Sequence, residues 1–131
     1  MIRLIFCLSV LTFFGCGQSG QRPYTDHSRD PEAFALDVKQ VVVNSVEDAK
    51  TSPEPEDEIS NIVDMLDDLS RQPTGDYRET YDQLLSLAGD IRAACAAANG
   101  RPSDLAARLD ELVALANQLP GTVTPPARPR D

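Results

Sequence analysis

The segment YRETYDQLLSLAGDIRAACAAA, residues 77–98, decides the fold. Its apolar residues recur at alternating steps of four and three, which puts them on one face of an α-helix packed nearly antiparallel against its neighbours. Asn99-Gly100 follows directly and is typical of the left-handed turn that ends a helix. We therefore predict a helix over about 76–98 with a continuous core face: Tyr77, Tyr81, Leu84, Ala88, Ile91, Cys95 and Ala98.

The segments on either side carry the same signal. After the long helix, Ser103 is a suitable N-cap and predicts a helix over about 103–119. Before it, Ser52-Pro53 predicts the start of a helix over about 53–71. In both segments apolar residues recur at steps of three and four: Ile59, Ile62, Val63, Leu66 and Leu69, then Leu105, Leu109, Leu112, Ala116 and Leu119.

The first predicted helix covers about 31–50 and opens with Asp30-Pro31, a good N-cap followed by a proline suited to the first turn. The triplet Val41-Val42-Val43 alone favours a strand, but no alternation of period two extends beyond it. The helix-favouring residues around the triplet lead us to predict a helix. Its expected core face consists of Phe34, Val38, Val41, Ser45 and Asp48/Ala49, widened by Ala35, Val42 and Val46.

Loops of a few residues join the four predicted helices, and short loops make sequential helices antiparallel. The sequence therefore predicts an all-α fold, an up-down-up-down four-helix bundle over residues 31–119. A three-helix core with the first helix loosely attached is the alternative. The Pro-rich residues 120–131 show no apolar periodicity, and we predict that they form a disordered or extended tail.

The N-terminal segment has a different character. Arg3 is followed by an uncharged, mainly apolar run over 4–14. At ~1.5 Å per residue this run spans about 16 Å, too short for a ~30 Å bilayer core but typical of a secretory signal peptide. It ends in Gly15-Cys16, and residues 1–17 resemble the lipobox of bacterial lipoproteins. Phe13 and Phe14 depart from that pattern, which usually has a leucine and a small residue there.

The resemblance implies that residues 1–15 are a signal peptide and that Cys16 carries lipid on its sulfur. Residues 16–30 then form a flexible tether, because their composition cannot build a core. The protein is expected to be exported and lipid-anchored to a bacterial cell membrane, facing the periplasm or the cell exterior. The alternative is an ordinary signal peptide, cut after Gly15 or Gly17, which releases a soluble protein. The resemblance gives no family for the helical part.

The chain is strongly acidic, with a formal net charge of −9 from 12 basic and 21 acidic residues. Nucleic acids and anionic lipids both need basic surfaces, so neither is an expected partner of the helical part. The expected partners are the membrane, through the lipid on Cys16, and a basic protein of the cell envelope. We assign no functional role to the basic residues, most of which are arginines.

Acidic residues are concentrated on the helix predicted over 53–71, where Asp57, Asp64 and Asp68 line up opposite the apolar stripe. We interpret them as a docking face for a basic partner or a weak surface for divalent cations. The alternative is a solvated face that keeps the protein soluble. Tyr77 and Tyr81 are a second candidate, either an aromatic patch for a partner or a half-buried cap on the end of the bundle.

Groups suited to catalysis do not occur in recognisable patterns. His27, the single histidine, lies in the tether without fixed partners, and we predict no catalytic residue, no metal site and no cofactor. Cys95 lies on a core face and is predicted to be a buried, unreactive thiol. We therefore expect a non-enzymatic interaction or structural module of the cell envelope. The alternative is a bundle that binds a small apolar ligand or a non-covalent cofactor between its helices.

Overall fold

A computed structural model describes residues 30–72 and 74–124. Within these ranges the chain forms helices and no strand: α1 Pro31–Thr51, α2 Pro55–Ser70, the short 3₁₀ helix η1 Gly75–Tyr77, α3 Arg78–Ala98 and α4 Leu105–Ala116. The predicted signal peptide, Cys16 and His27 lie outside the described residues.

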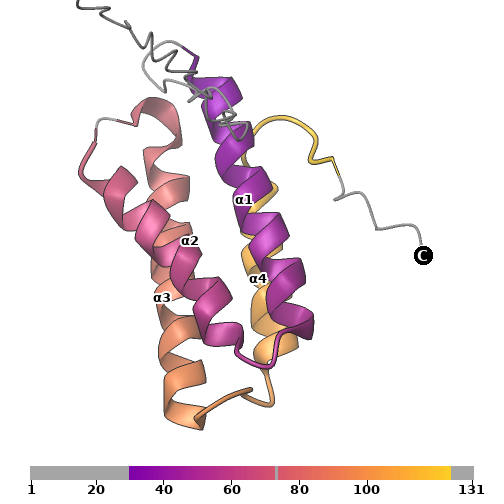
Figure 1. The fold of residues 1–131 in the computed structure, drawn as a ribbon. Helices are drawn as coiled ribbons and strands as arrows, with labels where there is room; N and C mark the ends of the chain where they lie inside the picture. The colour runs from indigo at the N-terminus through magenta and orange to yellow at the C-terminus, as the bar shows by residue number, and fades with distance from the viewer. Residues whose placement is uncertain (1–29, 73, 125–131) are drawn as a thin grey trace, which may run out of the picture.

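The four α-helices pack side by side as a bundle (Figure 1). Each contacts two others: α1 packs against α2 and α4, and α3 packs against the same two. The prediction of an all-α four-helix bundle is confirmed, and the up-down-up-down order stays a prediction. The alternative with a loosely attached first helix is wrong, because α1 buries side chains along its whole length.

The core is one aliphatic cluster shared by all four helices. On α3 the spacing of the sequence matches the buried residues, which are Tyr81, Leu84, Ala88, Ile91 and Cys95. The two ends of that predicted face are less buried: Tyr77 is half-buried and Ala98 is exposed. On α4 the buried residues are Leu105, Leu109, Leu112 and Ala116, and Leu119 continues the stripe just beyond the helix.

Helix α1 buries most of its predicted core face, namely Phe34, Ala35, Val38, Val42, Val46 and Ala49, and leaves Ser45 only partly buried. Ala35, Val42 and Ala49 are all 0% exposed and recur every seven residues, so they mark the centre of the face between α2 and α4. Val41 lies about 100° from Val42 around the helix and is 40% exposed. The prediction that Val41 belongs to the core face is therefore wrong. Lys39 lies at the opposite edge of the buried face of α1 from Val41 and is buried, at 6% exposure.

Most helix ends lie close to their predicted positions. Helix α2 begins at Pro55, two residues after its predicted start, and Glu54 rather than Ser52 is its N-cap. Ser52 ends α1 in an extended conformation, and its Oγ accepts a hydrogen bond from Glu54 N at 3.1 Å. At the end of α3, Asn99 has a φ of 51°, which confirms the predicted left-handed cap.

Basic side chains from other elements cap the C-termini of the remaining three helices. The last carbonyl groups of a helix have no partner within it and carry partial negative charge, so they favour cations. Arg101, in the α3–α4 loop, donates to the carbonyl oxygens of Ala49, Lys50 and Ser52 at 3.0, 2.8 and 2.7 Å. This loop is thereby fixed to the end of α1.

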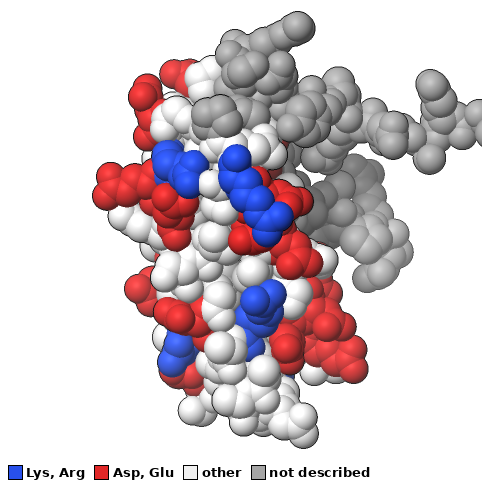
Figure 2. Space-filling model, turned by 90° about the vertical axis from the view of Figure 1, so that its left-hand side faces the viewer, with Lys and Arg blue, Asp and Glu red and all other residues white. Residues whose placement is uncertain are grey.

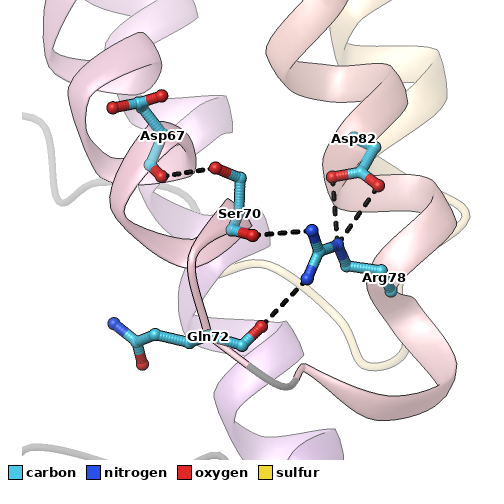
Figure 3. A network of polar contacts seen from close by, with 5 residues as sticks. All are labelled: Asp67, Ser70, Gln72, Arg78 and Asp82. Carbon is cyan, nitrogen blue, oxygen red and sulfur yellow. Dashed lines mark hydrogen bonds and ion pairs between the residues drawn. The ribbon is translucent and has the colours of Figure 1, made fainter.

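Arg78 caps the end of α2 (Figure 3). Its guanidinium donates to Ser70 O at 2.6 Å and to Gln72 O at 3.0 Å, and its Nε contacts both carboxylate oxygens of Asp82 at 3.2 Å. The Ser70 hydroxyl donates in turn to Asp67 O at 2.6 Å. The network joins the end of α2 to the first turn of α3.

Lys39 of α1 caps the end of the α4 segment. Its Nζ donates to Leu119 O at 3.1 Å and to Gly121 O at 2.8 Å. The neighbouring Gln40 holds Thr124 through two hydrogen bonds of 3.2 and 3.0 Å. Residues 120–124, predicted to begin the disordered tail, are therefore bound along α1, and residues 125–131 lie outside the described range.

Candidate functional site

The acidic face of α2 is the first candidate. Asp57, Asp64 and Asp68 are all exposed, and their spacing places them within about 40° of one another around the helix. Asp68 lies 4.0 Å from Arg71, but both side chains are at least 70% exposed, so this ion pair is weak. On the face drawn in Figure 2, acidic side chains are spread over most of the surface with basic ones among them, and the lower end is uncharged.

The three aspartates do not form one compact site. Asp57 and Asp68 are separated by 11 positions, about 16 Å along a helix. Asp57 lines a hollow of about 480 Å³ where the start of α2 meets Asn99 and Gly100. The carboxylates there sit at the positive end of the α2 dipole, which stabilises them. No group of three or more metal-ligating side chains occurs in the described part of the chain.

Asp68, at the other end of the face, borders an apolar groove between α1 and α2. The groove has a volume of about 280 Å³. Its buried lining consists of Phe34 and Val38 from α1 and Leu69 from α2, and the partly exposed Met65 and the exposed Val41 extend it to the surface. Two carboxylates also line it, Asp37 on the α1 side and Asp68 on the α2 side. We call this feature the α1–α2 groove.

Tyr77 and Tyr81 lie together, but only Tyr77 reaches the surface. Their ring centroids are 6.5 Å apart with the planes tilted by 54°. Tyr81 is only 2% exposed, and Tyr77 packs against the core as a half-buried side chain. Burial, with a smaller contribution from Tyr77, raises the pKa of Tyr81 to about 12. Tyr81 therefore belongs to the core, and the position of Tyr77 agrees with a cap on the bundle.

Cys95 is buried among the helices at 0% exposure, as its spacing predicted. Burial raises the pKa of its thiol, and the negative charge of Glu56 adds to this effect, while Arg101 and Arg108 oppose it. A thiol of raised pKa and no solvent access is a poor nucleophile. The residue therefore has a packing role in this bundle.

The α1–α2 groove was not predicted from the sequence, although one signal for it was present. Three consecutive valines cannot all face the core of a helix, because successive side chains are about 100° apart. One of Val41, Val42 and Val43 therefore had to approach the surface. The packing roles of Lys39, Arg78 and Arg101 were also missed, because their carbonyl partners are brought to them only by the fold.

None of the helices within residues 30–72 and 74–124 is long and apolar enough to span a bilayer. Comparison of the chain with protein-family models, curated proteins and solved structures found no match.

Proposed function

We propose that the protein is a lipid-anchored lipoprotein of the cell envelope whose acidic helical bundle binds a basic partner protein and catalyses no reaction. The lipobox-like residues 1–17 support the anchor. The observation that carries the binding role is the acidic α2 face, on which Asp57, Asp64 and Asp68 are exposed over about 16 Å. Complementary charge between two proteins speeds their association and favours oppositely charged partners over others. This effect weakens as salt is added.

A binder of a small apolar ligand is the second candidate, and the apolar lining of the α1–α2 groove favours it. However, the groove volume of about 280 Å³ falls slightly below the ~300–1,000 Å³ usual for small-molecule pockets. Exposed Val41 and two carboxylates also border the groove, so it does not enclose a ligand. A coloured protein, or one that purifies with a bound small molecule, would support this candidate over the first.

The anchor is tested by replacing Cys16 with serine and following the protein in membrane fractions and in detergent phase separation. The unchanged protein should stay with membranes in high salt, and Cys16→Ser should leave them, because serine offers no thiol for lipid attachment. Cys7→Ser is the matched control and should behave like the unchanged protein. Membrane retention of Cys16→Ser in high salt would contradict the anchor.

The binding role is tested with the immobilised full-length protein and an envelope extract of the cells that produce it. A basic protein should be retained at low salt and released at high salt. A triple variant of the acidic face, Asp57→Asn, Asp64→Asn and Asp68→Asn, should lose it. The control removes three exposed charges elsewhere: Glu79→Gln, Asp90→Asn and Glu111→Gln. Equal losses in both variants would show that only net charge matters and would contradict a binding face on α2.

A further inference from the structure

We propose that the α1–α2 groove takes an apolar side chain from a positively charged amphipathic helix of the partner. This inference rests on the proposed function and names the place where that partner docks. It joins two observations: an apolar groove that reaches the surface, and carboxylates on both helices that border it.

Val41 gives the groove an apolar surface that solvent reaches. It is the one large apolar residue classed as exposed in the described part of the chain, with 40% of its surface accessible. It adjoins Val38 and Leu69, which are 3% and 6% exposed. An apolar side chain inserted here would cover Val41 and contact buried neighbours on two helices. A groove of about 280 Å³ suits one or two such side chains.

Carboxylates border the α1–α2 groove on both sides. Asp37 lies on the α1 side and Asp68 on the α2 side, with Asp64 one turn before Asp68. An amphipathic helix that lays an apolar residue in a groove presents its polar residues to the borders. Lysine or arginine residues about one turn from the apolar anchor would therefore meet carboxylates on both sides.

The same borders disfavour other occupants. A second copy of this chain carries the same net charge of −9 and would place carboxylates against carboxylates. An anionic lipid surface would be repelled for the same reason. A basic helix is the occupant that matches both the apolar lining and the charge.

The test uses the full-length protein in non-ionic detergent and synthetic alanine-based helical peptides. The probe peptide carries two leucines at i and i+4 flanked by lysines, and a companion peptide replaces both leucines with alanine at the same charge. Affinity is measured by fluorescence anisotropy, and the site by amide chemical shifts of isotope-labelled protein. The protein variants are Val41→Gln, with Val43→Gln as its matched control on another side of α1, and Asp68→Asn, with Asp90→Asn as its control.

The probe peptide should shift amides within residues 34–41 and 65–72. Val41→Gln should weaken its binding by about fivefold to tenfold, as expected for losing one apolar contact, and Val43→Gln by less than twofold. The alanine companion should bind more weakly and should be insensitive to Val41→Gln, because it has no leucine to contact Val41 in either protein. Asp68→Asn should weaken binding and reduce its salt dependence, and Asp90→Asn should do neither.

Four results would overturn the inference. If both peptides bind equally and respond only to the aspartate variants, the groove proposal fails while binding of a basic partner stands. If neither peptide binds, the groove does not take a basic helix, whereas the envelope-extract experiment still decides the proposed function. If deletion of residues 17–29 strengthens binding more than tenfold, or if Val41→Gln abolishes a dimer seen by sedimentation, the occupant is the chain's own tether or a second copy.

Discussion

At the residue scale, burial controls the chemistry of two side chains on α3, Cys95 and Tyr81. Each is an acid whose charged form is disfavoured when water is removed, so both pKa values rise. They are tested by different measurements. Labelling of the Cys95 thiol measures its access to solvent, and ionisation of the Tyr81 phenol affects the stability of the fold at high pH.

Cys95 should resist thiol reagents in the native protein and react quickly in denaturant, since the thiolate is the reactive form. The measurement uses a Cys7→Ser and Cys16→Ser background, in which Cys95 is the remaining cysteine. Cys95→Ala should lower the free energy of unfolding by about 1 kcal/mol, the cost of a small cavity. Rapid labelling of the folded protein, or a dimer that reductant dissociates, would mean that this face of α3 is open.

Tyr81 should make the protein less stable as the pH rises from about 10 to about 12. Its pKa of about 12 in the fold lies above the ~10 of an exposed tyrosine. The folded state therefore binds the proton more tightly, and this stabilisation is complete below pH ~10 and is lost towards pH ~12. Urea unfolding across this range should show a smaller loss for Tyr81→Phe than for the unchanged protein or for Tyr77→Phe. An equal loss in all three would contradict the assignment to Tyr81.

Single residues were predictable where one helix decides their position. Cys95 follows from the spacing of α3 alone, and the structure buries it. The exposure of Val41 and the burial of Lys39 were not predictable in this way, because the face of α1 that becomes buried depends on where α2 and α4 pack against it. Lys39 is buried only because its Nζ meets carbonyl groups about 80 positions away in the sequence.

Between elements, the capping cations Lys39, Arg78 and Arg101 join helix ends to other parts of the bundle through hydrogen bonds to carbonyl groups. Lys39 is the most buried of these cations and fixes the segment that follows α4. Some loop positions require glycine for a different reason, because the backbone there has a positive φ.

Lys39→Met should lower the free energy of unfolding by about 1–3 kcal/mol, the cost of leaving buried carbonyl groups without a hydrogen bond. It should also speed hydrogen exchange of residues 119–124. Lys50→Met is the matched control: the partially exposed Lys50 pairs with Glu47 at 2.9 Å and Asp110 at 3.5 Å, and such surface pairs contribute less than about 1 kcal/mol. Equal effects of the two variants on stability and exchange would show that the Lys39 cap contributes nothing special.

Gly121→Ala and Gly89→Ala should change stability in opposite directions. Gly121 has a φ of +83°, and a Cβ there would lie 2.8 Å from Leu36 Cδ1, so alanine should destabilise the protein by about 1–2 kcal/mol. Gly89 lies within α3 with nothing within 4 Å of an added Cβ. Alanine there should stabilise by about 0.5–1 kcal/mol. Thermal unfolding of both variants checks this, and a stabilising Gly121→Ala would contradict the described path of the segment after α4.

Helices and their ends were predictable where the residues that determine them are close together in the sequence. The cap formed by Asn99-Gly100 and the 4-3 spacing of α3 lie within a few residues of the features they predict. Residues 120–124 contain too little apolar periodicity to indicate a fixed conformation, and their partners on α1 lie far away in the sequence. The sequence therefore predicted a tail where the fold holds a bound segment.

At the scale of the whole molecule, the acidic face of α2 and the α1–α2 groove are adjoining surfaces that share Asp68. The acidic face could be predicted because helical spacing alone aligns its residues. The groove could not, because it depends on how two helices pack together. The anchor and the partner remain proposals, and together they describe a membrane-tethered acidic bundle that recruits a basic protein.

In-cell photo-crosslinking tests this central claim most directly. A photoreactive amino acid replaces Asn61, an exposed residue between Asp57 and Asp64, or Ala107, an exposed residue of α4. We predict that position 61 crosslinks one basic envelope protein, that position 107 does not, and that adding Cys16→Ser removes the product by releasing the bundle from the membrane. No product from position 61, or the same products from both positions, would contradict the account.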